Sequence, residues 1–169
     1  SAEDKPENPA ASPAGPTREF TRALLEAAPA LRAFAISLAG DVVRADDLVQ
    51  ETLMRAWANA ATFHPGTNIN AWLFTILRNL FASQYRKRRR EVEDVEGEIA
   101  ARLSTPAEQE SRIEMNEMRL ALAQLQPDQR EAVLLVGASG FSYEEAAEIC
   151  GCAVGTIKSR VNRGRARLA

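Results

Sequence analysis

The chain has 169 residues, of which 46% are hydrophobic and 26% are charged, a composition typical of a soluble globular protein. This length allows one ordinary domain or two small domains. No apolar run reaches the roughly 18 residues that a membrane-spanning helix requires, and no secretory pattern opens the chain. We therefore expect a cytoplasmic protein without a membrane partner.

The net charge of −2 hides an uneven distribution of charge along the chain. Residues 1–90 carry 12 basic and 9 acidic side chains. Residues 91–117 carry 2 basic and 9 acidic side chains, and residues 118–169 carry 7 basic and 5 acidic side chains. An acidic connector between two blocks with basic ends indicates two domains. The predicted order is a disordered tail over 1–16, a helical domain over 17–90, a flexible acidic linker over 91–107 and a second helical domain over 108–169.

Helical periodicity runs through both predicted domains and predicts an all-α fold. In the first domain it predicts helices over residues 17–28, 29–40, 41–61 and 69–90. The second of these helices starts at Pro29, because proline suits the first turn of a helix.

In the second domain the pattern predicts one helix from Pro106, another from Pro127, and two more from Ser142 and from about Val154. The helix from Pro106 has apolar residues that we expect to face inward: Ile113, Met118, Leu120, Leu122 and Leu125.

The segment over 141–168 has the spacing of a helix-turn-helix. Ser142 and Glu145 form a capping box at the start of its first helix. The small Ala147 lets the two helices approach each other, Gly151 permits the turn, and Ile157 anchors the second helix.

The second helix of this segment is strongly basic. No acidic residue follows Cys152, and the cations are Lys158, Arg160, Arg163, Arg165 and Arg167. A helix N-terminus with a row of cations suits phosphate contact and insertion into a DNA groove. An ordinary helical hairpin with a basic solvated face is the alternative, but spacing, caps and charge together favour binding to duplex DNA.

Two features of the first domain leave its function open when each is taken alone. The helix over 69–90 carries aromatic residues and ends in five consecutive cations. It either contacts nucleic-acid phosphates and bases, or it is a core helix with a solvated basic end. The polar residues 46–51 form either a docking face for a basic partner or an ordinary solvated helix face.

Little in the sequence points to an enzyme. His64 is the only histidine and lies in a Pro-Gly loop, and neither a glycine-rich phosphate loop nor a metal-ligand cluster is present. Cys150 and Cys152 lack the spacing of redox or zinc sites and are expected to be free thiols. We therefore expect no catalysis, no cofactor and no small-molecule substrate.

Several of these segments together resemble one family, the extracytoplasmic-function (ECF) sigma factors. Residues 46–57 resemble the helix of these proteins that binds RNA polymerase, and residues 63–79 resemble their promoter-melting loop and helix. The segments that resemble their C-terminal DNA-binding domain are 125–132, 141–147 and 154–160.

The resemblance covers about residues 18–90 and 108–168, in the order that the family has. Residues 136–141 are also similar to the EcfG group, the general stress-response sigma factors of alphaproteobacteria. The resemblance implies a sigma region 2 bundle followed by a sigma region 4 helix-turn-helix. It implies a factor that directs promoter recognition, DNA melting and transcription initiation, with core RNA polymerase and promoter DNA as partners and a NepR-like anti-sigma factor as inhibitor.

The resemblance also implies roles for individual residues. Contacts with core polymerase are expected from Asp46, Asp47, Gln50 and Glu51. Recognition of the downstream promoter element is expected from Phe63, Thr67, Asn68, Asn79, Ser83, Arg86, Lys87 and Arg88. Recognition of the upstream element is expected from Tyr143, Glu144, Thr156, Lys158, Ser159, Asn162 and Arg163. The loop over 63–68 would hold a flipped base, which offsets the cost of local unpairing.

The alternative function is a helix-turn-helix transcriptional regulator that binds duplex DNA without polymerase. Such a regulator would need residues 141–168 but not the polar face within residues 46–57.

Overall fold

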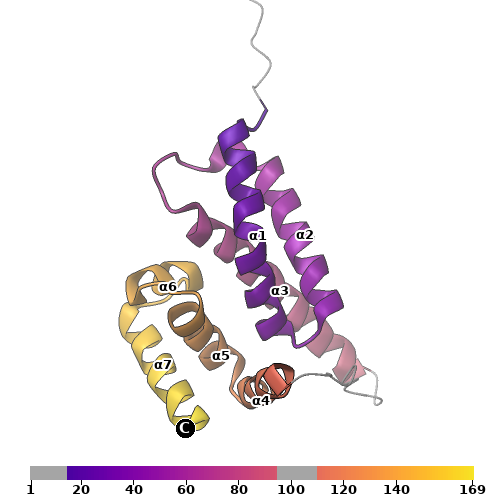
Figure 1. The fold of residues 1–169 in the computed structure, drawn as a ribbon, viewed down its shortest axis with the longest axis vertical. Helices are drawn as coiled ribbons and strands as arrows, with labels where there is room; N and C mark the ends of the chain where they lie inside the picture. Colours follow the sequence, from indigo (N-terminus) through magenta and orange to yellow (C-terminus); the bar gives the residue numbers. More distant parts are fainter. Residues whose placement is uncertain (1–14, 95–109) are drawn as a thin grey trace, which may run out of the picture.

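The computed structural model describes residues 15–94 and 110–169, and every regular element within them is a helix (Figure 1), which confirms the predicted all-α fold. The first helical group comprises α1 (Arg18–Ala39), α2 (Val42–Ala58), the short 3-10 turn η1 (Ala60–Thr62) and α3 (Ile69–Asp94). The second helical group comprises α4 (Glu110–Ala123), α5 (Pro127–Val133), the π-helical turn η2 (Leu134–Ala138), α6 (Tyr143–Cys150) and α7 (Val154–Leu168).

The reversal between α1 and α2 is set by one glycine and one aspartate. Gly40 has a φ of 70°, and its N–H donates to the carbonyl of Ile36 at 2.8 Å. The carboxylate of Asp41 then accepts from the N–H of Val43 at 3.0 Å and caps α2. A left-handed glycine followed by a capping side chain ends one helix and starts the next within two residues.

The first helical group encloses a core between α1, α2 and α3. Its most deeply buried large side chains are Leu31, Leu48, Leu73, Phe74 and Leu77. The rings of Phe34 and Phe74 join α1 to α3, with centroids 4.9 Å apart. This packing fixes the positions of α2 and α3, so their polar faces point outward in a defined arrangement.

One helix, not two, spans the residues on either side of Pro29. The ring of Pro29 removes the N–H that would bond to the carbonyl of Leu25, on a face of α1 where Leu25 is 67% exposed. On the opposite face, Leu24 and Leu31 are buried in the same core. The predicted break after residue 28 is therefore wrong, because packing on both sides of the proline outweighs one lost hydrogen bond.

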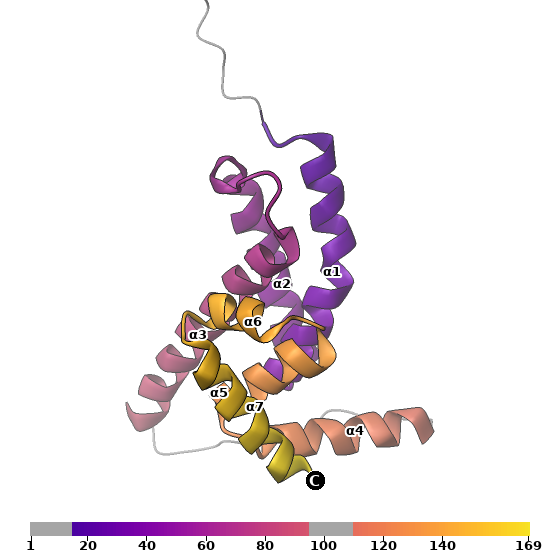
Figure 2. The same ribbon diagram turned by 90° about the vertical axis from the view of Figure 1, so that its left-hand side faces the viewer.

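Among the described side chains of α4, packing is confined to the C-terminal part. Leu122 is buried, as is Leu125 just after the helix, whereas Met118 and Leu120 are 57% and 52% exposed. Figure 2 shows α4 extending away from the other helices. The predicted inward orientation of Met118 and Leu120 is therefore wrong, because no neighbouring helix of the described chain covers that part of α4.

Some sequence predictions lie outside the described residues: the helix start at Pro106, the side chain of Ile113, and most of the tail over 1–16 and of the linker over 91–107. Where the structure does describe the end of α3, this helix continues to Asp94 instead of ending at Arg90. Among the described helices, none is both long and apolar enough to cross a membrane.

The core of the second helical group lies between α5, η2, α6 and α7. Leu135, Ala146, Ile157 and Val161 are fully buried there. Gly164 of α7 faces α5, and a Cβ atom at this position would meet Cγ2 of Val133 at 2.5 Å. The absence of a side chain at Gly164 therefore lets α7 approach α5 closely.

Replacing Gly164 with alanine tests this close approach. The variant should lose stability, because a methyl group forced into a packed contact costs about 1–3 kcal/mol. Gly155→Ala is the matched control in the same helix: its new Cβ would meet no atom within 4 Å, and higher helix propensity should stabilise it by up to about 1 kcal/mol. Urea unfolding followed by circular dichroism measures the free energy of unfolding of both variants. Equal values for Gly164→Ala and Gly155→Ala would contradict the proposed packing.

Candidate DNA and polymerase interfaces

Local hydrogen bonds build the helix-turn-helix of α6 and α7. The Ser142 hydroxyl accepts from the N–H of Glu145 at 3.0 Å, and the Glu145 carboxylate accepts from the N–H of Ser142 at 3.1 Å, which confirms the predicted capping box. Gly151 ends α6 with a φ of 66°, as the predicted turn requires. Ala147 is 5% exposed and Ile157 is fully buried, so the two helices meet over these residues.

The outer face of α7 presents polar and basic side chains to solvent. The exposed residues of this face are Lys158, Ser159, Asn162 and Arg163. The ammonium of Lys158 lies 5.8 Å from the ring centre of Tyr143, so the start of α6 and the outer face of α7 form one surface. A surface of this kind offers cations to phosphates and hydrogen-bonding groups to base edges.

Other predicted residues of this surface differ in exposure. Glu144 is exposed at the start of α6, whereas Tyr143 and Thr156 are half-buried. Arg160 points toward α5, where its guanidinium lies 3.5 Å from the carboxylate of Asp128. Arg160 is therefore not part of the basic surface predicted for this helix. It connects α7 to α5 instead.

A cavity of about 380 Å³ opens beside α3, between this helix and the end of α2. It is lined by Arg55, Asn59, Thr62, Trp72, Ile76, Asn79, Leu80 and Ser83. The predicted residues Asn79 and Ser83 therefore share one site, together with an aromatic ring and a cation that the sequence analysis did not assign to it. The spacing of Trp72, Ile76, Asn79 and Ser83 along one face of α3 is a sequence signal for Trp72. No sequence signal points to Arg55, which belongs to α2.

The loop over 63–68 is ordered by its own contacts. The ring of Phe63 packs on that of Trp72 with centroids 5.1 Å apart, and the Thr67 hydroxyl donates to the His64 carbonyl at 2.7 Å. The side-chain oxygen of Asn68 accepts from the N–H of Asn70 at 3.0 Å and caps α3. None of the three predicted loop residues lines the cavity itself.

The C-terminal half of α3 forms a basic end. Arg86, Lys87 and Arg88 are exposed, and Arg86 donates to the Ser83 hydroxyl at 3.5 Å. Burial lowers the pKa of Arg44 on α2, and the nearby charge of Arg88 lowers this pKa further. Positive charge is therefore concentrated where the C-terminal half of α3 passes the start of α2.

The outer face of α2 carries the predicted polymerase contacts. Asp46, Asp47 and Gln50 are exposed and Glu51 is half-buried. Asp46 pairs with Arg32 at 2.8 Å and Glu51 with Arg55 at 3.0 Å. Exposed ion pairs of this kind contribute about 0–1 kcal/mol, so a partner can replace them at little cost.

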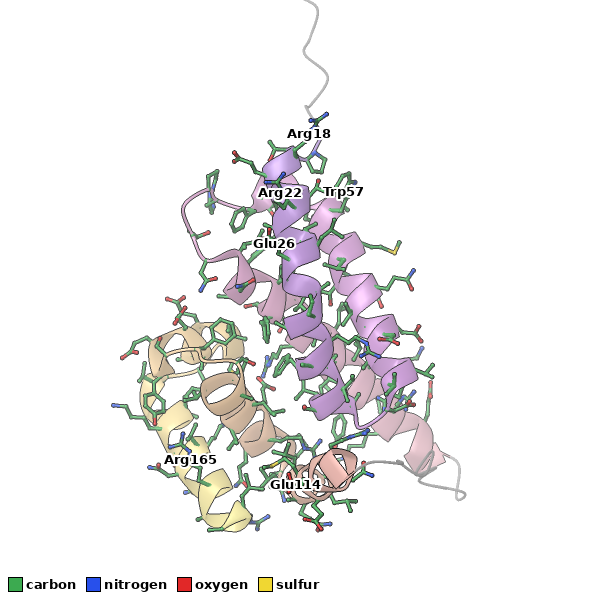
Figure 3. The ribbon with its side chains drawn as sticks, in the orientation of Figure 1. Arg18, Arg22, Glu26, Trp57, Glu114 and Arg165 are labelled. Carbon is green, nitrogen blue, oxygen red and sulfur yellow. The ribbon has the colours of Figure 1, made fainter. Side chains whose placement is uncertain are left out.

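An apolar groove of about 380 Å³ adjoins this polar face and was not predicted. Leu25 on α1 and Leu53, Met54 and Trp57 on α2 line it, together with Gln50. Leu25, Met54 and Trp57 are 67%, 65% and 48% exposed. Figure 3 shows Trp57 and Arg22 at the same end of the α1–α2 pair, the end that lies away from α4 and α7.

The described residues hold no group of three or more His, Cys, Asp or Glu side chains that could bind a metal ion. Cys150 and Cys152 are free thiols, the first buried and the second half-buried. Burial raises the pKa of the Cys150 thiol, and the negative charge of Glu131 raises it further. Cys150 is therefore a hydrogen-bond donor rather than a nucleophile.

Comparison with known proteins gives consistent matches for both helical groups. The family model for sigma-70 region 2 matches residues 24–91, and the model for sigma-70 region 4 matches residues 115–168. The ECF RNA polymerase sigma factor EcfG of Rhodopseudomonas palustris is 66% identical over 146 residues, which cover 86% of this chain and 81% of that protein. The ECF sigma factor SigC of Mycobacterium tuberculosis is 37% identical over 131 residues, which cover 77% of this chain and 71% of that protein.

Solved structures agree with these matches. The sigma factor RpoE of Bartonella quintana, solved in complex with the anti-sigma factor NepR, superposes with a TM-score of 0.82 at 55% identity, over 90% of this chain and 95% of that chain. CnrH, solved in complex with the cytosolic domain of CnrY, superposes with a TM-score of 0.69 at 28% identity, over 89% of this chain and 85% of that chain.

A region 2 bundle followed by a region 4 helix-turn-helix defines a sigma factor, the subunit that directs RNA polymerase to promoters. The chain belongs to the ECF family of RNA polymerase sigma factors, and its similarity to EcfG places it in the EcfG group. A regulator that acts without polymerase would have no use for the region 2 bundle, so the comparisons do not support that alternative.

Replacing Ser142 with alanine tests how the cap of α6 supports the helix-turn-helix. Loss of the hydroxyl leaves the N–H of Glu145 without its partner, which costs about 1 kcal/mol. Amide hydrogen exchange within α6 should therefore become about fivefold faster. Ser159→Ala, on the exposed face of α7, is the control and should leave exchange in α6 unchanged, whereas equal effects of the two variants would contradict the capping role.

Proposed function

We propose that this sigma factor holds a promoter at two points and docks on core polymerase through α2. The outer face of α7 enters the major groove of the upstream element, where Lys158, Asn162 and Arg163 contact bases and phosphates. The cavity beside α3 captures a base flipped out of the downstream element. The basic end of α3 holds the DNA backbone electrostatically.

The cavity beside α3 is the observation that supports this proposal most strongly. It combines the ring of Trp72 with the polar side chains of Asn79 and Ser83. Stacking on an aromatic ring and hydrogen bonds to a base edge are the interactions that hold an unstacked base. Arg55 lies at the same site and supplies a cation for a neighbouring phosphate. A protein that binds only closed duplex DNA would have no use for such a cavity.

Docking on polymerase uses the polar face of α2 and the adjacent apolar groove. Asp46, Asp47, Gln50 and Glu51 supply polar contacts around the exposed side chains of Met54 and Trp57. An apolar centre with charged groups beside it is the usual composition of a protein interface. The charged groups orient the partner, and burial of the apolar groups supplies affinity.

A NepR-like anti-sigma factor controls the chain, as expected for a general stress-response factor of the EcfG group. The similar sigma factor RpoE was solved in complex with the anti-sigma factor NepR, and CnrH was solved in complex with the cytosolic domain of CnrY. The groove formed by Leu25, Leu53, Met54 and Trp57 suits the apolar face of an amphipathic helix. An inhibitor bound there would compete with polymerase for the same end of the α1–α2 pair.

Reconstituted transcription with core polymerase, on a promoter selected from random DNA, tests the proposal. Asp47→Arg should weaken binding to core polymerase at least tenfold, or about 1.4 kcal/mol, because it reverses a charge on the docking face. Asn79→Ala should leave polymerase binding intact and slow promoter opening about tenfold, because it removes a hydrogen bond to the flipped base.

Glu114→Arg is the matched control, since this exposed carboxylate lies on α4 and belongs neither to the polar face of α2 nor to the cavity beside α3 (Figure 3). It should change neither polymerase binding nor promoter opening. Failure of the folded chain to direct initiation from any promoter would contradict the proposed function, and unaltered opening by Asn79→Ala would contradict the role of the cavity.

A further inference from the structure

Three aromatic rings from different parts of the first helical group pack together. The ring centre of Phe20 on α1 lies 6.0 Å from that of Phe63 and 6.0 Å from that of Trp72, and the ring centres of Phe63 and Trp72 are 5.1 Å apart. The three pairs of planes are tilted by 49°, 60° and 45°. Tilted rings at such separations attract each other. The three residues therefore form a closed ring cluster, in which each ring contacts both of the others.

The ring cluster joins the two ends of the loop over 63–68. Phe63 is the first residue of this loop, and Trp72 lies one turn into α3, where its N–H donates to the carbonyl of Asn68 at 3.2 Å. Phe20 packs on both rings from α1. The hydrogen bond from the Asn68 side chain to the Glu145 carboxylate, at 2.9 Å, is exposed. Because water competes for exposed polar groups, the apolar ring contacts hold the ends of the loop more firmly than this bond does.

Local structure fixes the position of Phe20 itself. Thr17 caps α1, and its hydroxyl accepts from the N–H of Phe20 at 3.1 Å. One turn later, Leu24 is buried in the core of the first helical group. A capped first turn, followed by a buried residue on the same helix face, leaves this end of α1 little freedom to fray or rotate. Phe20 therefore presents its ring from a rigid element.

Phe20 reaches the site proposed for base capture only through Trp72. Trp72 lines the cavity beside α3 together with Asn79 and Ser83, whereas Phe20 is not among the lining residues. Phe20 and Phe63 line a separate cavity of about 720 Å³ next to the start of α1. This cavity leaves the ring of Phe63 space into which it could move. The contacts within the ring cluster therefore determine where the rings of Phe63 and Trp72 lie.

We infer that Phe20 is a positioning residue for base capture, which holds the ring of Trp72 at the cavity beside α3 and fixes the span of the loop over 63–68. The inference rests on the proposed function, because it assigns a task at the same cavity. A stacking ring that is already in place does not have to be ordered when the base arrives, so less binding free energy is lost. Loss of the Phe20 ring should therefore slow promoter opening although Phe20 itself does not touch the base.

Tryptophan fluorescence of the free chain tests the packing. Trp57 and Trp72 are the two tryptophans of the chain, so Trp57→Phe leaves Trp72 alone. In this background, Phe20→Leu should move the emission of Trp72 to longer wavelength and increase its quenching by acrylamide, because Trp72 loses a ring and gains water. Phe20→Tyr keeps the ring and should match the background. Emission from Phe20→Leu equal to that of the background would overturn the inference.

Phe34→Leu is the matched control for loss of a ring in the first helical group. Phe34 is buried, and its ring packs on that of Phe74 with centroids 4.9 Å apart, but it belongs neither to the ring cluster nor to the cavity beside α3. This variant should lower the stability of the chain, because it removes part of a buried ring. It should leave the emission of Trp72 unchanged.

Promoter opening in the reconstituted system tests the functional role. On a promoter selected from random DNA, the captured base is the one whose replacement by an abasic nucleotide slows opening by the wild-type chain most. Phe20→Leu should slow opening of the intact promoter by roughly threefold to tenfold, the effect expected from one lost aromatic contact. On the abasic template, Phe20→Leu and wild type should open DNA equally fast, because the ring of Trp72 has no base to hold. Phe34→Leu should match wild type on both templates.

Wild-type opening of the intact promoter by Phe20→Leu, or equal slowing on both templates, would overturn the inference, because Phe20 would then not act through the captured base. If Phe20→Leu lacks a native circular dichroism spectrum, Phe20→Met takes its place in both measurements, since it keeps an unbranched apolar side chain without a ring. An abasic scan with no sensitive position would overturn base capture, and with it the task of Phe20. The fluorescence would still report on the ring cluster in that case, so the two failures are distinguishable.

Discussion

The arrangement of the whole molecule depends on one buried carboxylate. Glu131 belongs to the second helical group, but the cation that balances its charge, Arg78, belongs to the first. A carboxylate taken out of water costs several kcal/mol unless it is paired and hydrogen-bonded. The second group therefore has two satisfactory positions: packed on α3 with Glu131 paired, or separated from it with Glu131 in water. The position of α6 over α3 and the contact between Asn68 and Glu145 belong to the first of these.

The functional surfaces differ in how this packing affects them. The polar face of α2, the groove around Trp57 and the outer face of α7 are all exposed in the packed arrangement. Polymerase and an anti-sigma factor can therefore approach the α1–α2 pair in either position of the second group. The loop that ends at Asn68 differs, because a carboxylate of α6 holds it.

The features that were predicted best from the sequence are those determined by residues close to one another along the chain. The capping box of Ser142 and Glu145 and the turn at Gly151 involve residues a few positions apart, and local chemistry decides them. The break expected at Pro29 and the inward orientation of Met118 were wrong because packing decided both: a shared core carries α1 through the proline, and α4 extends beyond its neighbours.

The candidate site was only partly predictable for a related reason. Resemblance to a family pointed to Asn79 and Ser83, and the structure brings them together, but the part that Trp72 and Arg55 play in the same cavity depends on how α2 packs beside α3. Arg78 and Glu131 are 53 positions apart in sequence, and Asn68 and Glu145 are 77 apart. No periodic pattern connects residues at such separations, so only the folded chain reveals them.

The most direct measurement is the distance between the two helical groups before and after promoter binding. Spin labels at Arg22→Cys on α1 and Ala169→Cys after α7, in a Cys152→Ser background, report this distance by double electron–electron resonance. We expect a single narrow distance distribution in the free chain, whose helical groups are packed together, and a clearly shifted distribution in the open complex with core polymerase and promoter DNA. The same distance in both states would contradict a sigma factor whose helical groups separate to read two promoter elements.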